Sequence, residues 1–103
     1  MIDYKDACRI AIENAKTKDV PFDYQICTII DCVDFYNIGF AYFEKITGKK
    51  LKFSHPILMV DISKDDGHIL PLRVYLPGTE YGNIINAGIE IEVPQEFQQR
   101  NNV

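Results

Sequence analysis

The two histidines, His55 and His68, are candidate metal ligands or general bases. His55 precedes Pro56 at the start of an expected strand, and His68 follows an Asp-Asp-Gly turn. Because they flank opposite ends of that strand, they should stand roughly 20 Å apart at ~3.3 Å per residue. Neither has a helical partner and no HExxH motif occurs, so the sequence predicts solvated histidines and no metal site.

Three cysteines, Cys8, Cys27 and Cys32, could offer thiol chemistry. The N-terminus has no basic stretch followed by an apolar run, so no signal peptide is expected. An odd number of cysteines in that context predicts reduced thiols in the cytoplasm. Cys27 and Cys32 are four residues apart, which is not the CxxC spacing of a redox or zinc pair. We expect these side chains to pack as small hydrophobes.

Two groups of carboxylates invite an acid–base interpretation. They are Asp31, Asp34 and Glu44, and Asp61, Asp65 and Asp66. Turn formation accounts for Asp65 and Asp66 of the second group, and the calcium-loop pattern is absent. Neither serine lies in a GxSxG motif, and a Cys–His pairing has no local signature. The sequence therefore predicts no enzyme and no cofactor, with a small hydrolase or ligand-binding domain as the remaining alternative.

These residues belong to a chain of 103 amino acids whose composition is that of a globular protein. Hydrophobic residues make up 47% and charged residues 25%, which excludes a disordered chain. The 11 Lys and Arg against 15 Asp and Glu give a net charge of −4, which opposes general nucleic-acid binding. The longest aliphatic run, residues 57–60, is far short of the ~18 residues of a membrane span. We expect one cytoplasmic domain.

The first half of the chain predicts one helix and two strands. A helix is expected over residues 3–18, with Asp3 as its N-cap and a stripe of small apolar residues. Residues 22–31 and 35–44 alternate as strands, and the second is rich in aromatic residues. One face of the two strands collects Tyr24, Ile26, Thr28, Ile30, Tyr36, Ile38, Phe40 and Tyr42. Residues 45–53 form a loop with four lysines.

The second half predicts a hairpin over residues 56–62 and 68–76. A three-residue loop, Asp65-Asp66-Gly67, pairs Ile62 with Leu70, whereas a four-residue loop pairs Ile62 with Ile69. The first register is favoured because it aligns three aliphatic pairs. Pro71 then suggests an edge or bulge opposite Asp61.

Residues 77–88 look irregular, residues 89–93 alternate as a short strand, and residues 95–103 form a polar tail. The expected domain therefore spans residues 1–94. The fold class is α+β, with an N-terminal helix packed on an antiparallel sheet of four or five strands.

The helix can cover only one sheet face, yet both faces are apolar. The opposite face would carry Cys27, Ile29, Phe35, Phe43, Ile57, Met59, Ile69 and Tyr75. Two explanations stay open. Either the C-terminal segment folds back, bringing Ile84, Ile85, Ile91 and Phe97 over this face, or a second copy or another protein covers it.

The charges are laid out in three blocks. Residues 1–44 and residues 53–103 each carry a net charge of −4, and residues 45–52 carry +4. An acidic surface with aromatic residues suits recognition of a basic protein.

The order of elements also resembles the immunity protein 35 family of bacterial toxin-neutralising proteins. Phe40, Tyr42 and Phe43 look like the aromatic strand of that family. Residues 56–61 (Pro56 to Asp61) look like its Pro-aliphatic-Val-Asp strand, and Gly67 its turn glycine. The resemblance spans roughly residues 5–75 and implies a small cytoplasmic inhibitor that binds and blocks a toxin domain. The family is not defined by catalytic residues, so none is implied here.

The leading hypothesis is an immunity protein that acts by stoichiometric occlusion of a basic toxin domain. The expected partner-binding residues are Asp31, Asp34, Phe35, Phe43, Glu44 and Asp61. The alternative is a homodimeric, non-catalytic binding module that uses its aromatic sheet face. Neither hypothesis involves nucleic acid or a membrane.

Overall fold

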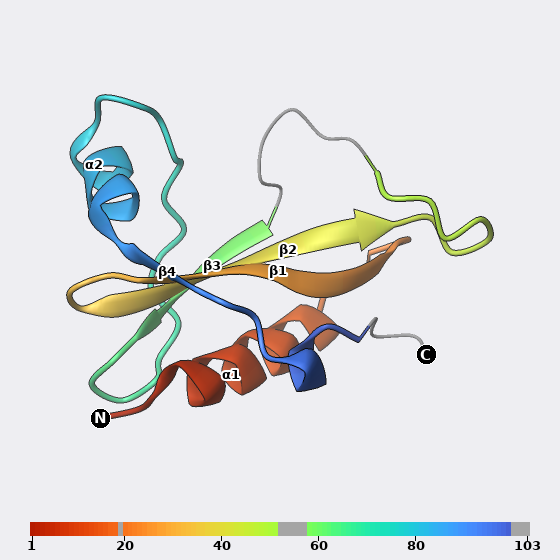
Figure 1. The fold of residues 1–103 in the computed structure, drawn as a ribbon, viewed down its shortest axis with the longest axis horizontal. Helices are drawn as coiled ribbons and strands as arrows, with labels where there is room; N and C mark the ends of the chain where they lie inside the picture. The colour runs from red at the N-terminus through yellow and green to blue at the C-terminus, as the bar shows by residue number, and fades with distance from the viewer. Residues whose placement is uncertain (19, 52–57, 100–103) are drawn as a thin grey trace.

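The computed structural model of the chain describes residues 1–18, 20–51 and 58–99. The elements in chain order are α1 (Tyr4–Lys16), β1 (Asp23–Asp31), β2 (Phe35–Phe43), β3 (Leu58–Ser63), α2 (Glu80–Ala87), β4 (Ile89–Ile91) and the 3₁₀ helix η1 (Gln95–Phe97). The strands form one antiparallel sheet in the order β3-β2-β1-β4. α1 lies along one face of this sheet, and α2 packs near one end of the other (Figure 1). The predicted α+β fold is confirmed.

α1 begins where the sequence predicts. The Asp3 side chain accepts a hydrogen bond from the backbone N–H of Asp6, and the Asp6 side chain accepts one from Asp3, which completes a capping box. Its inward face consists of small side chains, namely Ala7, Cys8, Ala11 and Ala15, all of them buried. Small side chains let the helix approach the sheet closely.

A β-bulge in β1 changes which of its residues point to each face of the sheet. The pairing of β1 with β2 shifts at Cys27, where β1 carries one extra residue. Ile29, expected on the far face, is therefore buried on the α1 side, while Ile30 packs on the α2 side. The predicted alternation was wrong beyond the bulge. Gly39 pairs with Thr28 here, and a Cβ at Gly39 would lie only 2.3 Å from the Thr28 hydroxyl oxygen.

The predicted hairpin forms in part and in the other register. Ile62 pairs with Ile69, and the N–H of Ser63 donates to the carbonyl of His68 at 2.9 Å. The turn therefore has four residues and ends at Gly67, whose φ is +78°. The last hydrogen bond of the ladder is donated by the N–H of Leu70 to the carbonyl of Asp61. Pairing ends there because the next residue, Pro71, has no backbone N–H to donate. The predicted strand over residues 68–76 is not formed.

Residues 77–88, expected to be irregular, contain α2. The Thr79 side chain caps this helix by accepting from the N–H of Gly82 at 3.1 Å. Gly82 belongs in the first turn because a Cβ there would lie 2.3 Å from the carbonyl oxygen of Leu76. β4 then forms within the predicted strand 89–93. Phe97, expected in a polar tail, lies buried in the core.

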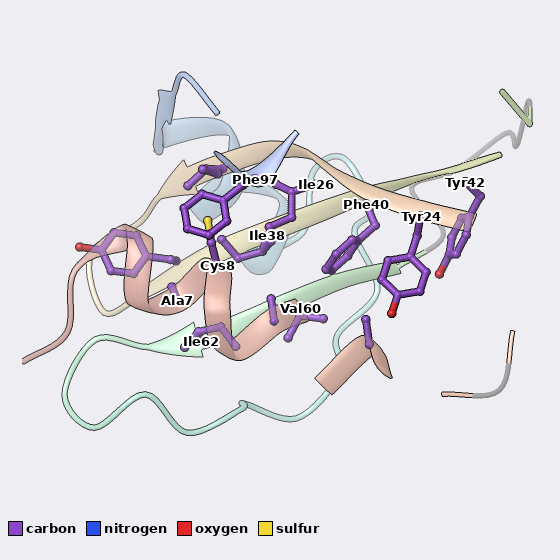
Figure 2. Packing of buried hydrophobic residues seen from close by; sticks show 14 residues of the cluster. Ala7, Cys8, Tyr24, Ile26, Ile38, Phe40, Tyr42, Val60, Ile62 and Phe97 are labelled. Atoms are coloured by element: carbon purple, nitrogen blue, oxygen red, sulfur yellow. The ribbon is translucent and has the colours of Figure 1, made fainter. Parts of the chain in front are cut away.

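Two clusters of buried side chains divide the molecule. The helix-side cluster holds fourteen buried residues from α1, β1, β2, β3 and η1, gathered between α1 and the sheet (Figure 2). The α2-side cluster holds Cys32, Phe35, Tyr81 and Ile85. The second sheet face is thus covered in part from within the chain, by Ile85 and Ile84 as one explanation proposed. Ile91 and Phe97, however, pack on the other side.

Residues 52–57, which include His55, Pro56 and Ile57, lie outside the described part of the chain. No helix among the described residues is long and apolar enough to cross a membrane.

Candidate protein-binding surface

The structure separates the six predicted partner-binding residues. Asp31, Asp34 and Phe35 lie around the β1–β2 turn, whereas Phe43 and Glu44 lie at the other end of β2. The length of β2 places the two groups about 26 Å apart at 3.3 Å per residue. Asp61 is buried in β3, opposite Asn37. The six residues therefore do not form one continuous surface.

An open groove lies at the β1–β2 turn. Its volume is about 740 Å³, and it runs between that turn, α2 and the start of β4. The residues that line it are Asp31, Cys32, Val33, Glu80, Asn83, Ile84, Ala87, Gly88 and Ile89. We call this feature the acidic groove, because its only charged lining residues, Asp31 and Glu80, are both carboxylates. Val33 and Ile89 are largely exposed and supply apolar surface.

The charges around the groove are unbalanced. Lys64 and Arg73 are the only Lys or Arg residues among described residues 58–99. Lys64 forms a short ion pair with Asp31, and Arg73 lies 3.6 Å from Asp61. The hydrogen bond to Asp31 raises the pKa of Lys64, which keeps it cationic.

Three carboxylates in the groove or next to it in sequence form no ion pair with another described residue. Glu80 lines the groove, and Asp34 and Glu90 adjoin its lining residues Val33 and Ile89 in sequence. All three are exposed. The groove therefore combines an apolar lining with uncompensated negative charge.

A buried polar network holds α2 on the sheet. The Tyr81 hydroxyl donates to Asp61 Oδ2 at 2.8 Å, and Asn37 Nδ2 donates to Asp61 Oδ1 at 2.8 Å. The guanidinium of Arg73 lies 4.2 Å from the centre of the Tyr81 ring, which in turn stacks on Phe35. Helix, sheet and residue 73 thus meet at one carboxylate.

The chemistry of this network suits a structural role, namely the positioning of α2 on the sheet. Burial, together with the hydrogen bond to Asp61, raises the pKa of Tyr81, so its phenol stays protonated. A protonated, hydrogen-bonded phenol is neither a base nor a nucleophile at neutral pH. The Asn37 Oδ1 atom is buried and has no hydrogen-bond partner among the residues that the structure describes.

The thiols and the described histidine add no obvious reactive centre. Burial raises the pKa of Cys8 to about 12 and that of Cys32 to about 11, as expected for packed thiols. Cys27 is exposed at the bulge, contrary to the packing expected for it. His68 makes a short contact with Asp66 in an exposed turn. Among the described residues, no cluster of three His, Cys, Asp or Glu side chains could hold a metal ion.

The sequence prediction missed the α2 side of the groove. Glu80, Asn83 and Ile84 were placed in an irregular segment, although Thr79 is a good N-cap. Tyr81, Ile84 and Ile85 also recur at helical spacing. The nearby glycines Gly78 and Gly82 obscured that signal.

Comparison with known proteins returned no match among family models, curated proteins or solved structures. The resemblance to the immunity protein 35 family therefore rests on the sequence features described above.

Proposed function

We propose that this chain is an immunity protein that binds and neutralises a bacterial toxin domain by stoichiometric occlusion. The observation that carries the proposal is the acidic groove, with its apolar lining and the exposed Glu80 carboxylate, which forms no ion pair with another described residue. Such a surface suits a basic partner that inserts an apolar or aromatic side chain. Occlusion of an active site needs affinity and shape, and no reaction by the inhibitor.

Each part of the groove has a separate role in this proposal. Val33, Ile84 and Ile89 would receive the apolar anchor, since anchors buried at the centre of an interface carry most of its binding energy. The carboxylates of Asp34 and Glu80 would attract Lys and Arg of the toxin and speed its association. The Tyr81–Asp61 network fixes α2 in place, so that one wall of the groove is set before binding.

The homodimer alternative would use the aromatic sheet face. Every residue of β2 is buried, including Phe35 beneath Tyr81 and Tyr36, Phe40 and Tyr42 on the α1 side. Use of these rings by a second copy would require one of the covering elements to leave. A dimer built on these aromatic rings is therefore disfavoured.

Co-expression with the protein encoded in the adjacent reading frame, as the candidate toxin, tests the proposal. The chain should restore growth of a bacterial host that expresses the toxin domain, and the two proteins should co-purify in a 1:1 ratio. The double variant Asp34→Lys/Glu80→Lys should lose most of this protection. Glu44→Lys is the matched control, because Glu44 is an exposed carboxylate at the other end of β2.

Two results would contradict the proposal. One is a failure of the wild-type chain to bind or protect. The other is binding that survives the groove substitutions and is lost with Glu44→Lys.

A further inference from the structure

Residues 71–76, here called segment 71–76, expose aliphatic side chains at alternate positions. Leu72, Val74 and Leu76 are 82%, 71% and 52% exposed. The two residues between them turn inward, because Arg73 lies over the Tyr81 ring and the Tyr75 hydroxyl donates to Asn86 at 2.8 Å. Alternation of this kind is typical of an extended strand with one solvated face.

The backbone of this segment has no partner strand. The ladder to β3 ends at Leu70, and in the described part of the chain no hydrogen bond involves the backbone of residues 71–75. Unpaired backbone groups beside exposed aliphatic side chains are a template for strand addition. The segment thus offers both the hydrogen bonds and the side chains that an added strand uses.

We propose that segment 71–76 pairs antiparallel with the same segment of a second copy, about a two-fold axis at Val74. In this register Val74 faces Val74 of the second copy, and Leu72 of each copy faces Leu76 of the other. The exposed row is therefore self-complementary, as an isologous interface requires. Aliphatic pairs directly across two strands are stabilising.

The charge distribution permits a second copy as the occupant, and the self-complementary row of aliphatic side chains favours it. The chain carries a net charge of −4, so two copies repel over most of their surfaces. Segment 71–76 contains no carboxylate, and its one cation, Arg73, is turned inward to Asp61. Two copies can therefore meet at this segment without opposing like charges.

The small contact predicts a weak dimer. A pair of six-residue strands buries less than the roughly 1,200 Å² typical of stable interfaces. Dimers should therefore form only at high protein concentration. None of the residues that line the acidic groove belongs to the segment, so this proposal does not depend on the proposed function.

Sedimentation velocity of the full chain in a reducing buffer tests the pairing. The reductant prevents disulfide formation through exposed Cys27. Between about 10 µM and about 1 mM protein, the weight-average mass should rise from 11.8 kDa toward twice that value. Val74→Asp and Val74→Lys should each abolish the rise, because like charges then face each other across the axis.

An equimolar mixture of the two Val74 variants should restore the dimer, since opposite charges then meet. Ile46→Asp, at a fully exposed site outside the segment, is the matched control and should dimerise like the wild type. Circular dichroism confirms that each variant is folded. A wild-type mass of 11.8 kDa at every concentration overturns the proposal. So does a folded Val74→Asp variant that still dimerises, or a mixture of the two variants that stays monomeric.

Discussion

The two faces of the sheet are built differently. On the α1 side, small residues of the helix press onto a continuous layer of aliphatic and aromatic side chains. On the α2 side, the cluster holds four buried hydrophobic residues, and one of them, Tyr81, shares the Asp61 carboxylate with Asn37 and Arg73. The difference indicates that the α1 face carries most of the stability. The α2 face instead fixes the shape of the acidic groove, the surface through which we propose that the chain binds a toxin domain.

The largest expected effect is loss of a side chain from the α1 face. Ile38→Ala removes a fully buried side chain from β2 and should lower the free energy of unfolding by about 2–5 kcal/mol. For Ile85→Ala in α2, the loss in free energy of unfolding should lie at or below the lower end of that range, because Ile85 belongs to a smaller cluster. Urea unfolding followed by circular dichroism measures both. Equal losses would remove the contrast between the faces.

Breaking the polar network should have an intermediate effect. Tyr81→Phe leaves Asp61 without its hydroxyl donor and should lower the free energy of unfolding by about 1–3 kcal/mol. Tyr75→Phe is the matched control, since its hydroxyl bonds Asn86 in an exposed position and should contribute less than about 1 kcal/mol. Hydrogen exchange in α2 should also speed up in Tyr81→Phe alone. Unchanged exchange there would mean that the network does not hold the helix.

Alkaline pH should lower the free energy of unfolding through one buried thiol on each face of the sheet. The folded chain raises the pKa of Cys8 to about 12 and of Cys32 to about 11, above the value of 9.0 for a free thiol. Above pH 9 the unfolded chain therefore binds fewer protons than the folded chain, so stability falls as the pH rises. Each thiol can contribute at most about 1.4 kcal/mol per pH unit.

Urea unfolding in reducing buffer at pH 8 and pH 10 measures this effect. Cys32→Ala should make the fall smaller, and a stability that does not change between the two pH values would refute the prediction.

The smallest effect on stability is expected in the groove itself. Glu80→Lys places a cation in the first turn of α2, where the helix dipole favours an anion, and should cost less than about 1 kcal/mol. Thermal unfolding of this variant checks the size of the loss. A larger loss would mean that Glu80 supports the fold, so that weaker partner binding could no longer be attributed to the groove.

The parts of the fold that the sequence predicted are those fixed by local pattern. The Asp3 cap, the small-residue stripe of α1 and the alternation of β2 depend on neighbouring residues, and they formed as predicted. The bulge at Cys27 could not be predicted in this way, because it depends on how Thr28 meets Gly39 of another strand. The hairpin register likewise followed tertiary packing, with Gly67 lying against α1.

The candidate site was predicted in part. Asp31 was expected at the binding surface and does line the groove. Phe35, expected in contact with a partner, is buried under Tyr81. The other wall of the groove was missed because Gly78 and Gly82 obscured the helical pattern, and the reason for Gly82, its close approach to the backbone of Leu76, is not visible in the local sequence.

Binding at the acidic groove is tested most directly by an NMR titration of the ¹⁵N-labelled chain with the unlabelled candidate toxin from the adjacent reading frame. We expect saturation at one equivalent, with amide shifts concentrated in residues 31–34 and 80–90. The lysine-rich turn that follows β2 should stay unperturbed. Shifts concentrated in residues 42–50, or no shifts at all, would contradict it.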